Sequence, residues 1–461
     1  MRLEKLEIEN FKCFKSKKAF DFSRITILTG ANSSGKSTVM QAVLGAVQTD
    51  GFPFFYSPNG KYENLGDFTE MFNFYSDGSY LSRKDDRIKF QFRFLEAISN
   101  LQFSMKIELK CDVYKMPYVR ELEINNSFCN ISLKCHKDNY YYGDHLTGHF
   151  EFIYDFNKLT KLFNDRKNEL SKAFQEIKYE IKEKFGEEIE IKIDNEVSYT
   201  FSSQNCKDLE KVLDFFNNWH NQPIFSDILF LSEVFEKDFN FISAFRNVAK
   251  RTQDVKVKSN YKIEKDGEGY IDQIVEWEKR SNGKIKKLVE VLKALDLIED
   301  ISVNRLSGGR FELLVKAKNS KILTSLTNVG FGVSQFLPII VADLQLSDNS
   351  TLFLAEPEIH LHPSIQSKFG EYIVNQVNTT EKNYVIETHS EYFLNRIRLA
   401  IVKGELKKED VKVYFLENNG DDTEVFDIDF TKTGAIKNAP NNFFETYYMD
   451  TMDIALNAFA E

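Results

Sequence analysis

The chain has 461 residues, of which 42% are hydrophobic and 28% are charged. This length is too great for one ordinary domain and predicts two or three structural units with full hydrophobic cores. The net charge of −10 argues against a protein coated by nucleic acid through bulk electrostatics, although it leaves room for a local basic groove. The sequence contains no run of about 18 apolar residues, so we expect no membrane span. We also expect no signal peptide, because the N-terminus lacks the apolar core of one. We therefore expect a cytoplasmic protein with no membrane partner.

The cysteines indicate ordinary reduced thiols. None belongs to a C-x-x-C pair, and their number is odd. Two of them lie near His136 but are too few and wrongly spaced for a zinc site. Reduced thiols are usual in the cytoplasm. The cysteines are Cys13, Cys111, Cys129, Cys135 and Cys206.

A complete phosphate-binding loop, G-x-x-x-x-G-K-[ST], spans Gly30–Thr38. The run Ile25–Thr29 before it predicts a buried strand, and Val39–Leu44 after it predicts a helix. In this context the backbone N–H groups turn towards a phosphate, and the helix N-terminus adds the positive end of its dipole. Lys36 then reaches the β- and γ-phosphates, and the Ser37 hydroxyl holds Mg²⁺. The residues expected to bind the nucleotide are Gly30, Asn32, Ser33, Ser34, Gly35, Lys36, Ser37 and Thr38.

Two segments after the loop helix alternate strictly between apolar and polar residues. They are Ile88–Phe94 and Leu101–Leu109, and this period of two is typical of half-buried antiparallel strands. More strand-like runs follow to about residue 153. The sequence therefore predicts an antiparallel sheet within an N-terminal lobe, residues 1–154. The 42 Phe and 20 Tyr residues indicate aromatic-rich sheet cores rather than surfaces that stack on bases.

Residues 155–300 are predicted to form a mixed helical and hairpin insertion. Between residues 156 and 185 the apolar residues adopt helical spacing, and four of them form a seam like that of a coiled coil. The seam fits either one amphipathic helix on a core or a short oligomerising contact, since it covers only about two heptads. Ile189 to Phe201 predicts a hairpin, and Ile285 to Leu297 predicts a helix. The seam consists of Leu170, Phe174, Ile177 and Ile181.

The C-terminal lobe, residues 301–461, contains two apolar strands that lead into chemically active residues. Thr351–Glu358 has the form of a Walker B strand, which would deliver Glu356 next to the γ-phosphate to polarise the attacking water. Tyr384–Ser390 predicts a second strand that ends at His389. In ATP-binding-cassette (ABC) enzymes this position carries the switch histidine, which touches the γ-phosphate. We therefore expect Glu356 and His389 to be catalytic.

An ABC enzyme also needs a signature motif, a Gly/Ser-rich turn that opens a helix and grips the γ-phosphate bound to another subunit. Leu306–Gly309 matches the string LSGG, but Arg310–Val315 after it predicts a strand, so we interpret LSGG as a hairpin turn. Val329–Gln335 precedes Phe336–Leu344, which can form a helix with Pro338 in its first turn. The predicted signature residues, which act in trans, are Gly332, Ser334 and Gln335.

Together these motifs resemble those of the RecF/SMC-like bacterial ABC ATPases, especially the branch related to the ATPase half of OLD-family nucleases. The resemblance rests on Leu354–Pro363, Phe331–Gln335, Glu387–Ser390 and the N-terminal strand with its loop. It covers about residues 1–70 and 320–445. It implies an α/β fold: an ABC-type P-loop NTPase head with a mixed sheet, an antiparallel β-subdomain and an α+β insertion. ATPase components of anti-phage defence systems, such as the PARIS system, are similar.

One position departs from the family pattern. Walker B strands of the family usually end in two acidic residues, the first for Mg²⁺ and the second for catalysis, and here the first is Ala355. Either Glu356 is catalytic and Mg²⁺ rests on Ser37, phosphates and waters, or Glu356 serves the metal and a group such as Glu358 activates water. The first alternative predicts slow hydrolysis. A chain that binds ATP without hydrolysing it is the further alternative.

The resemblance implies an ATP-driven switch with Mg²⁺ and ATP as cofactors. The chain would form a homodimer or higher oligomer and control a separate effector, such as a Toprim-like nuclease, in anti-phage defence. The alternative is a RecF/SMC-like DNA repair ATPase that binds DNA ends. A fused nuclease is disfavoured, because only about 70 residues follow His389 and a Toprim domain is as large as a whole domain. Gly420–Asp422 is more simply the solvated turn of a hairpin between Val411–Leu416 and Val425–Ile428.

Overall fold

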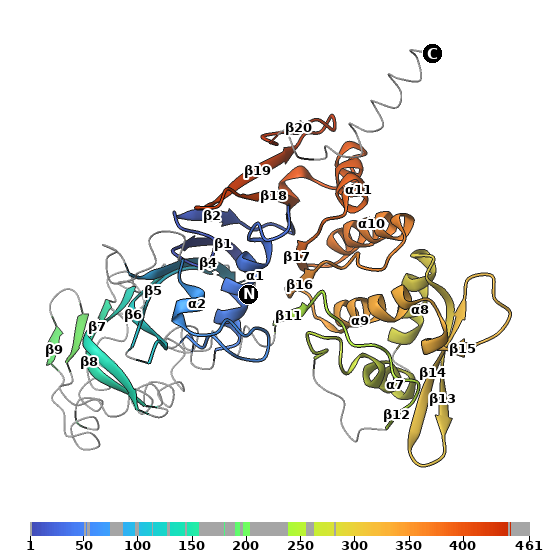
Figure 1. Ribbon diagram of the computed structural model, residues 1–461, viewed down its shortest axis with the longest axis horizontal. Coiled ribbons are helices and arrows are strands. Elements are labelled where there is room, and N and C mark those ends of the chain that lie inside the picture. Colours follow the sequence, from blue (N-terminus) through green and yellow to red (C-terminus); the bar gives the residue numbers. More distant parts are fainter. Residues whose placement is uncertain are drawn as a thin grey trace, which may run out of the picture. The chain divides into compact units, whose positions relative to one another are not determined.

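The protein is described from a computed structural model of the chain (Figure 1). Contacts divide it into two compact units, and each is described by itself. Unit 1 comprises Met1–Asp21, Thr38–Glu236 and Gly420–Asp422; unit 2 comprises Phe22–Ser37, Lys237–Asn419 and Thr423–Glu461. The structure describes residues 2–49, 52, 56–73, 86–96, 101–112, 114–126, 130–142, 145–155, 179, 190–193, 197–202, 238–254, 262–280, 283–440 and 443.

The phosphate-binding loop belongs to unit 2, although the sequence-based division places it in the N-terminal lobe. The chain passes from unit 2 to unit 1 between Ser37 and Thr38, within helix α1 (Lys36–Val47). The three-part division at residues 154 and 300 stays a prediction. The apolar seam between residues 156 and 185 lies outside the described residues, as do Cys129 and Cys206. Cys13 and Cys111 are free thiols.

Unit 1 is built on one antiparallel sheet with the order β2-β1-β4-β5-β6-β7-β8-β10-β9. The alternation at Ile88–Phe94 and Leu101–Leu109 is confirmed, because both segments are antiparallel neighbours in it. The predicted hairpin is confirmed by the pairing of Val197 with Ile193. A short helix, α2 (Phe68–Met71), lies outside the sheet. The strands are β1 (Arg2–Glu9), β2 (Lys18–Asp21), β4 (Ile88–Glu96), β5 (Leu101–Cys111), β6 (Pro117–Asn126), β7 (Asn130–Tyr142), β8 (His145–Asp155), β9 (Glu190–Ile193) and β10 (Val197–Ser202).

Aromatic rings fill the core of unit 1. Phe90 and Phe92 on β4 are fully buried. The Phe90 ring meets Phe11 edge-on with centroids 5.1 Å apart, and it stacks on Tyr56 at 5.7 Å. Phe92 stacks on Phe94 at 5.8 Å. Such rings contribute large buried areas and specific geometry. These five aromatic residues therefore stabilise the sheet core, as the composition predicts.

Unit 2 is built on a mixed sheet with the order β11-β16-β17-β3-β18-β19-β20. The first five strands run parallel, and β19 and β20 continue antiparallel. Ligands of parallel α/β sheets bind beyond the carboxyl ends of the strands. The strands are β3 (Ile25–Gly30), β11 (Phe239–Ile242), β16 (Thr351–Ala355), β17 (Asn383–Glu387), β18 (Val411–Asn418), β19 (Thr423–Phe430) and β20 (Ile436–Lys437).

The remaining elements of unit 2 are helices and a second, smaller antiparallel sheet. Helices α7–α9 lie beside the β13–β14 hairpin, and α10 packs on α11 (Figure 1). The helices are α7 (Tyr270–Arg280), α8 (Lys284–Ala294), η3 (Leu326–Asn328), α9 (Phe331–Gln345), α10 (Pro363–Thr379), α11 (Glu391–Val402) and η4 (Lys408–Asp410). The small sheet contains β12 (Gln253–Asp254), β13 (Ile298–Leu306), β14 (Arg310–Ala317) and β15 (Thr324–Ser325). The predicted helix at Ile285–Leu297 corresponds to α8.

The structure confirms that LSGG is a turn. Leu306 pairs with Arg310 across the β13–β14 hairpin, and Gly308 and Gly309 have φ values of 76° and 72°. Glycine adopts this left-handed region without strain. The expectation that Pro338 lies in the first turn of the following helix is wrong, because α9 begins at Phe331 and contains Pro338 in its interior.

The predicted hairpin near the C-terminus is confirmed as β18–β19, but its turn is not simply solvated. The Asp422 carboxylate accepts hydrogen bonds from the backbone N of Lys15 at 2.8 Å and Ser16 at 3.3 Å. It also pairs with Lys18 at 3.1 Å. These bonds hold the turn within unit 1. Among the described residues, no helix is both long and apolar enough to cross a membrane.

A buried polar network stabilises the centre of unit 2. Asp343 on α9 is 1% exposed. It accepts hydrogen bonds from the Tyr384 hydroxyl at 2.8 Å and from Tyr372, and Lys382 Nζ lies 3.3 Å from its Oδ1. A buried charge is tolerated only when it is paired and hydrogen-bonded. These bonds therefore fix α9 against β17 and α10.

Replacing Asp343 with alanine is expected to lower the free energy of unfolding by about 3 to 5 kcal/mol, because Lys382 then remains buried without its counter-charge. Urea denaturation followed by tryptophan fluorescence measures this loss. Asp348→Ala is the matched control, since Asp348 is exposed and should change the free energy by about 0.5 kcal/mol or less. An Asp343→Ala chain as stable as the control would contradict the network's role.

Candidate functional site

The phosphate-binding loop joins β3 to α1 as the sequence predicts. All residues of β3 are buried. Gly30 at its end has a φ of 134°, and a Cβ there would lie 2.1 Å from the Leu416 carbonyl oxygen on β18. Gly35 has a φ of 102°. These two positions need glycine because of close backbone approach and left-handed conformation, respectively, and together they set the curvature of the loop.

Lys36 is buried within the loop that it serves. It is 4% exposed, and its Nζ donates to the carbonyl oxygens of Ala31 at 2.7 Å and Gly30 at 3.2 Å. The Ser34 side chain is also buried, and its backbone carbonyl accepts a bond from the Thr423 hydroxyl at 3.2 Å. The ammonium group thus lies against the loop backbone, where a phosphate-binding lysine is expected.

The other predicted loop residues differ in their surroundings. Asn32, Ser33 and Ser37 are exposed, and Ser33 has a left-handed φ of 58°. Thr38 belongs to unit 1, where its hydroxyl lies 3.7 Å from the Cys13 sulfur. The loop therefore presents Asn32, Ser33 and Ser37 to solvent while Lys36 is held inside.

Glu387 is a site residue to which the sequence analysis gives no role. It ends β17, is 3% exposed, and its Oε1 accepts a 2.7 Å hydrogen bond from the Ser37 hydroxyl. Strand β17 lies between β16 and β3, and Glu387 is the register partner of Ala355. Register partners project from the same face of a sheet, so Glu387 supplies a carboxylate beside the position where the family acid is missing. The only sequence signal for Glu387 is its place at the end of the apolar strand that precedes His389.

The Walker B turn follows β16 and carries two further carboxylates. Glu356 has a left-handed φ of 43°, and its backbone N donates to the Glu387 carbonyl at 2.8 Å. Glu358 Oε1 accepts a 2.6 Å bond from the backbone N of His389. Left-handed non-glycine residues are costly and cluster at functional sites. The structure therefore brings Glu356, Glu358, Glu387 and His389 together at the carboxyl ends of β16 and β17.

The Glu356 carboxylate lies close enough to act electrostatically on five other charged or titratable side chains. They are Lys36, Arg246, Glu358, Glu387 and His389. Such coupling requires proximity in a region of low dielectric constant. A dense set of perturbed acids and bases is typical of a functional site.

The pKa values shift for identifiable reasons. Burial raises the pKa of Glu387, against the lowering effects of the Ser37 hydrogen bond and the Lys36 charge. Burial also raises the pKa of Glu358. For His389, burial and then the Lys36 charge lower the pKa, so the imidazole is neutral near pH 7. A neutral imidazole can accept or donate a hydrogen bond at a phosphate.

The oxygen atoms beside the loop suit Mg²⁺. Mg²⁺ prefers hard oxygen ligands and is usually held by one or two protein groups together with nucleotide phosphates and water. The Ser37 hydroxyl and Glu387 carboxylate, 2.7 Å apart, provide such oxygens. In the described part of the chain, no group of three or more His, Cys, Asp or Glu side chains is arranged to hold a metal. The Ser37 hydroxyl and the Glu387 carboxylate fit a metal ion that is bound together with a nucleotide.

The predicted signature residues lie at the start of α9, but they face inward. Ser334 is 4% exposed and its hydroxyl donates to the Phe331 carbonyl at 2.9 Å. Gln335 is 3% exposed and donates to the Asn247 carbonyl at 3.2 Å. A Cβ on Gly332 would lie 2.5 Å from the His360 carbonyl. The exposed part of this segment is instead the uncapped helix start at Phe331, which is 45% exposed.

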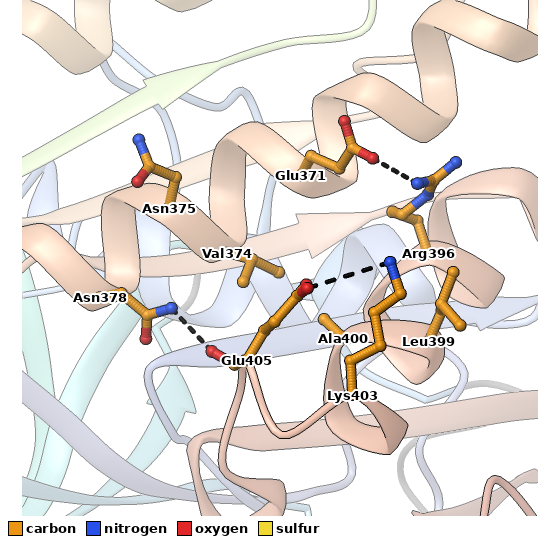
Figure 2. A pocket seen from close by; sticks show the side chains of 9 residues that line it. All are labelled: Glu371, Val374, Asn375, Asn378, Arg396, Leu399, Ala400, Lys403 and Glu405. Carbon is orange, nitrogen blue, oxygen red and sulfur yellow. Dashed lines mark hydrogen bonds and ion pairs between the residues drawn. The ribbon is translucent and has the colours of Figure 1, made fainter.

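A separate hollow lies between α10 and α11 (Figure 2). Its charged side chains pair with each other: Glu371 with Arg396, and Lys403 with Glu405 at 3.9 Å. Asn378 donates to the Glu405 carbonyl at 2.7 Å. None of the predicted site residues lines this hollow. The hollow is therefore a different place from the nucleotide site.

Comparison with known proteins gives one family match. The family model described as AAA ATPase domain matches residues 1–394. No curated protein matches the chain. Among solved structures, the SMC head domain from Thermotoga maritima is similar, with 11% identity and a TM-score of 0.41 over 93% of this chain and 100% of that chain.

Two further solved structures are similar at the same level. The Smc head bound to the C-winged helix domain of ScpA has 10% identity and a TM-score of 0.46, over 93% of this chain and 98% of that chain. The Smc head with an extended coiled coil, bound to the C-terminal domain of ScpA from Pyrococcus furiosus, has 10% identity and a TM-score of 0.40. That match covers 100% of this chain and 99% of that chain.

Proposed function

The chain belongs to the AAA ATPase domain family, and from that premise we propose that it is a Mg²⁺-dependent ATPase of the ABC type whose site is completed by a second copy. The observation that carries this proposal is the convergence of Lys36, Ser37, Glu356, Glu387 and His389 at one edge of the unit 2 sheet. Each group matches a distinct requirement of phosphoryl transfer to water.

The geometry supports a proposed role for each residue. Lys36 and the loop amides bind the β- and γ-phosphates. Glu356 orients and polarises the attacking water, since its carboxylate lies among the site charges and its backbone is fixed by Glu387. His389 hydrogen-bonds the γ-phosphate through its imidazole. Ser37 and Glu387 would hold Mg²⁺, which would supply positive charge to offset the charge that develops on the phosphates.

Glu387 takes the part of the acid that Ala355 lacks. Its carboxylate already bonds the Ser37 hydroxyl, which is the arrangement needed to orient that hydroxyl towards a metal. Carboxylates that hold a metal ligand in place strengthen the site. This assignment leaves Glu356 free for catalysis and Glu358 to hold the His389 backbone. The proposed chain is therefore an active hydrolase rather than an inert ATP-binding scaffold.

The second copy is proposed because the start of α9 lacks a cap and lies open. Gly330 makes no side-chain cap bond, and Phe331 next to it is 45% exposed. A free helix N-terminus attracts anions. The γ-phosphate bound to one chain would meet this helix start in the other chain, so ATP closes the dimer and hydrolysis releases it.

We expect Glu356→Gln to trap the closed dimer, because it binds ATP but polarises water poorly. Light scattering should show a twofold rise in mass with Mg²⁺ and ATP. Adding Phe331→Asp should abolish that rise, since its charge repels phosphate while an acid in the first helical turn does not destabilise the helix. Tyr392→Asp in the first turn of α11 is the matched control. An unchanged mass in Glu356→Gln with ATP bound would contradict the dimer.

We further propose that this switch controls a separate effector in anti-phage defence. The support is the motif resemblance to the ATPase half of OLD-family nucleases and to ATPases of such systems. Affinity capture of the Glu356→Gln chain with and without ATP, followed by mass spectrometry, tests this role, and an ATP-dependent nuclease-like partner is expected. Retention of DNA instead, with affinity that falls steeply as salt rises, would favour the DNA-repair alternative.

A further inference from the structure

Arg246 is a buried cation to which no role has yet been assigned. It follows β11, which pairs with the Walker B strand β16, and it is 7% exposed. The backbone around it is anchored, because Ser243 N donates to the Lys265 carbonyl at 2.8 Å and Asn247 N donates to the Asp266 carbonyl at 2.8 Å. The guanidinium is therefore carried by a fixed segment next to the Walker B turn.

The hydrogen-bonding capacity of Arg246 is largely unused. Its Nη2 donates to the Glu356 carbonyl at 3.4 Å, whereas Nε and Nη1 are buried without a partner among the described residues. Glu358 Oε2 is likewise buried and unpartnered there. A buried guanidinium is normally paired with a carboxylate or phosphate because its desolvation is costly. A purely structural role does not account for these open donors and acceptors.

The charges at this position act on each other. Burial lowers the pKa of Arg246 to about 10, while Glu358 and then Glu356 pull it upward. The guanidinium therefore lies close enough to both carboxylates to attract them.

The same segment also contacts the signature helix. Gln335 on α9 donates to the carbonyl of Asn247, next to Arg246, at 3.2 Å. Within the first turn of α9, Gly332 packs against the His360 carbonyl, and the Phe331 ring lies 4.8 Å from the His360 ring. Arg246 thus lies where the Walker B turn and α9 are joined within one chain.

We propose that Arg246 is a positioning residue of the ATP site, whose guanidinium holds the Glu356–Glu358 turn in its reactive arrangement. This inference rests on the proposed ATPase function. Arg246 acts through the turn rather than on the nucleotide. Its removal should therefore slow hydrolysis while leaving ATP binding at the P-loop nearly intact.

The test compares Arg246→Met and Arg246→Lys with the exposed control Arg251→Met, whose side chain pairs with Glu312 at 3.4 Å. We expect Arg246→Met to lower kcat at least about tenfold, the scale of supporting interactions, with the Kd for ATP changed less than about threefold. Arg246→Lys should recover part of kcat, since lysine retains the charge without the planar fork.

Wild-type kcat in Arg246→Met would overturn the inference, as would loss of ATP binding in step with kcat. If Arg246→Met does not fold, Arg246→Lys decides the matter: reduced kcat with an unchanged Kd for ATP supports the inference, and unchanged kcat overturns it. A wild-type chain without Mg²⁺-dependent ATPase activity would contradict the proposed function instead. An active wild-type chain with an unaffected Arg246→Met variant contradicts only the role of Arg246.

Discussion

Replacing Lys36 with alanine is expected to abolish ATP binding and, with it, hydrolysis and dimer closure. Lys36 provides the buried positive charge of the loop, since its Nζ lies against the Ala31 and Gly30 carbonyls. Truncating one partner of a buried charge pair costs about 3 kcal/mol or more. This corresponds to at least about a 100-fold rise in Kd. Fluorescence titration with a labelled ATP analogue measures the change.

Lys412→Ala is the matched control for this variant. Lys412 lies on β18 next to β3 and pairs with Asp427 at 2.9 Å on the surface of unit 2. Its loss should leave the Kd for ATP unchanged, because exposed ion pairs contribute little. An Lys36→Ala chain that is folded by circular dichroism and still binds ATP as tightly as this control would show that the loop is not the nucleotide site.

Replacing Glu387 with glutamine is expected to cause the second-largest loss. The change preserves size and the Ser37 contact but removes the carboxylate charge that we assign to the metal side of the site. Supporting carboxylates of metal sites typically contribute about 10- to 100-fold in affinity or activity. We therefore expect kcat to fall by about 100-fold. The Mg²⁺ concentration that gives half-maximal activity should rise, and the Kd for ATP measured without Mg²⁺ should change little.

The pH dependence of the wild-type chain gives an independent check on Glu387. Burial raises its pKa, and the metal needs the ionised form, so activity should fall in acid at a pH above the ordinary value for a glutamate. Glu371→Gln on α10 is the control, because Glu371 pairs with Arg396 away from the site. A Glu387→Gln chain with wild-type kcat and wild-type Mg²⁺ dependence would remove Glu387 from the mechanism.

The double variant Ala355→Asp with Glu387→Gln tests whether an acid on β16 can replace the acid on β17. The two positions are register partners, so an aspartate at 355 would return a carboxylate to the same face of the sheet. Partial recovery of the Mg²⁺ dependence is the expected outcome. A double variant no more active than Glu387→Gln would show that the metal requires the carboxylate on β17 itself.

Local patterns predicted much of the fold because they depend on neighbouring residues. The P-loop strand and helix, the alternating strands at Ile88–Phe94 and Leu101–Leu109, and the strand at Thr351–Ala355 all appear in the structure. The strand pattern after LSGG is also local, and it correctly predicted that LSGG is a hairpin turn. The grouping of β3 with the C-terminal strands in one unit could not be predicted, because it depends on pairing across more than 300 residues.

Site residues that belong to a sequence motif could be predicted, whereas residues that reach the site only through strand pairing could not. Lys36, Glu356 and His389 follow from motif order. Glu387 becomes visible only when β17 pairs with β16 beside Ala355, and Arg246 only when the short strand β11 joins the same edge. Such residues have no fixed spacing from the loop, since they are brought together by the sheet rather than by the local sequence.

The most direct test of the central claim, that one site is built from two copies, mixes two inactive variants. Lys36→Ala cannot bind ATP but presents a wild-type α9, whereas Phe331→Asp binds ATP but presents a repelling helix start. A mixed dimer contains one complete site. We predict that each variant alone shows no ATPase activity and that an equimolar mixture recovers about a quarter of the wild-type rate, because half of the dimers are mixed and each has one of two sites. A mixture as inactive as its components, in chains that are folded and associate, would contradict a site shared between copies.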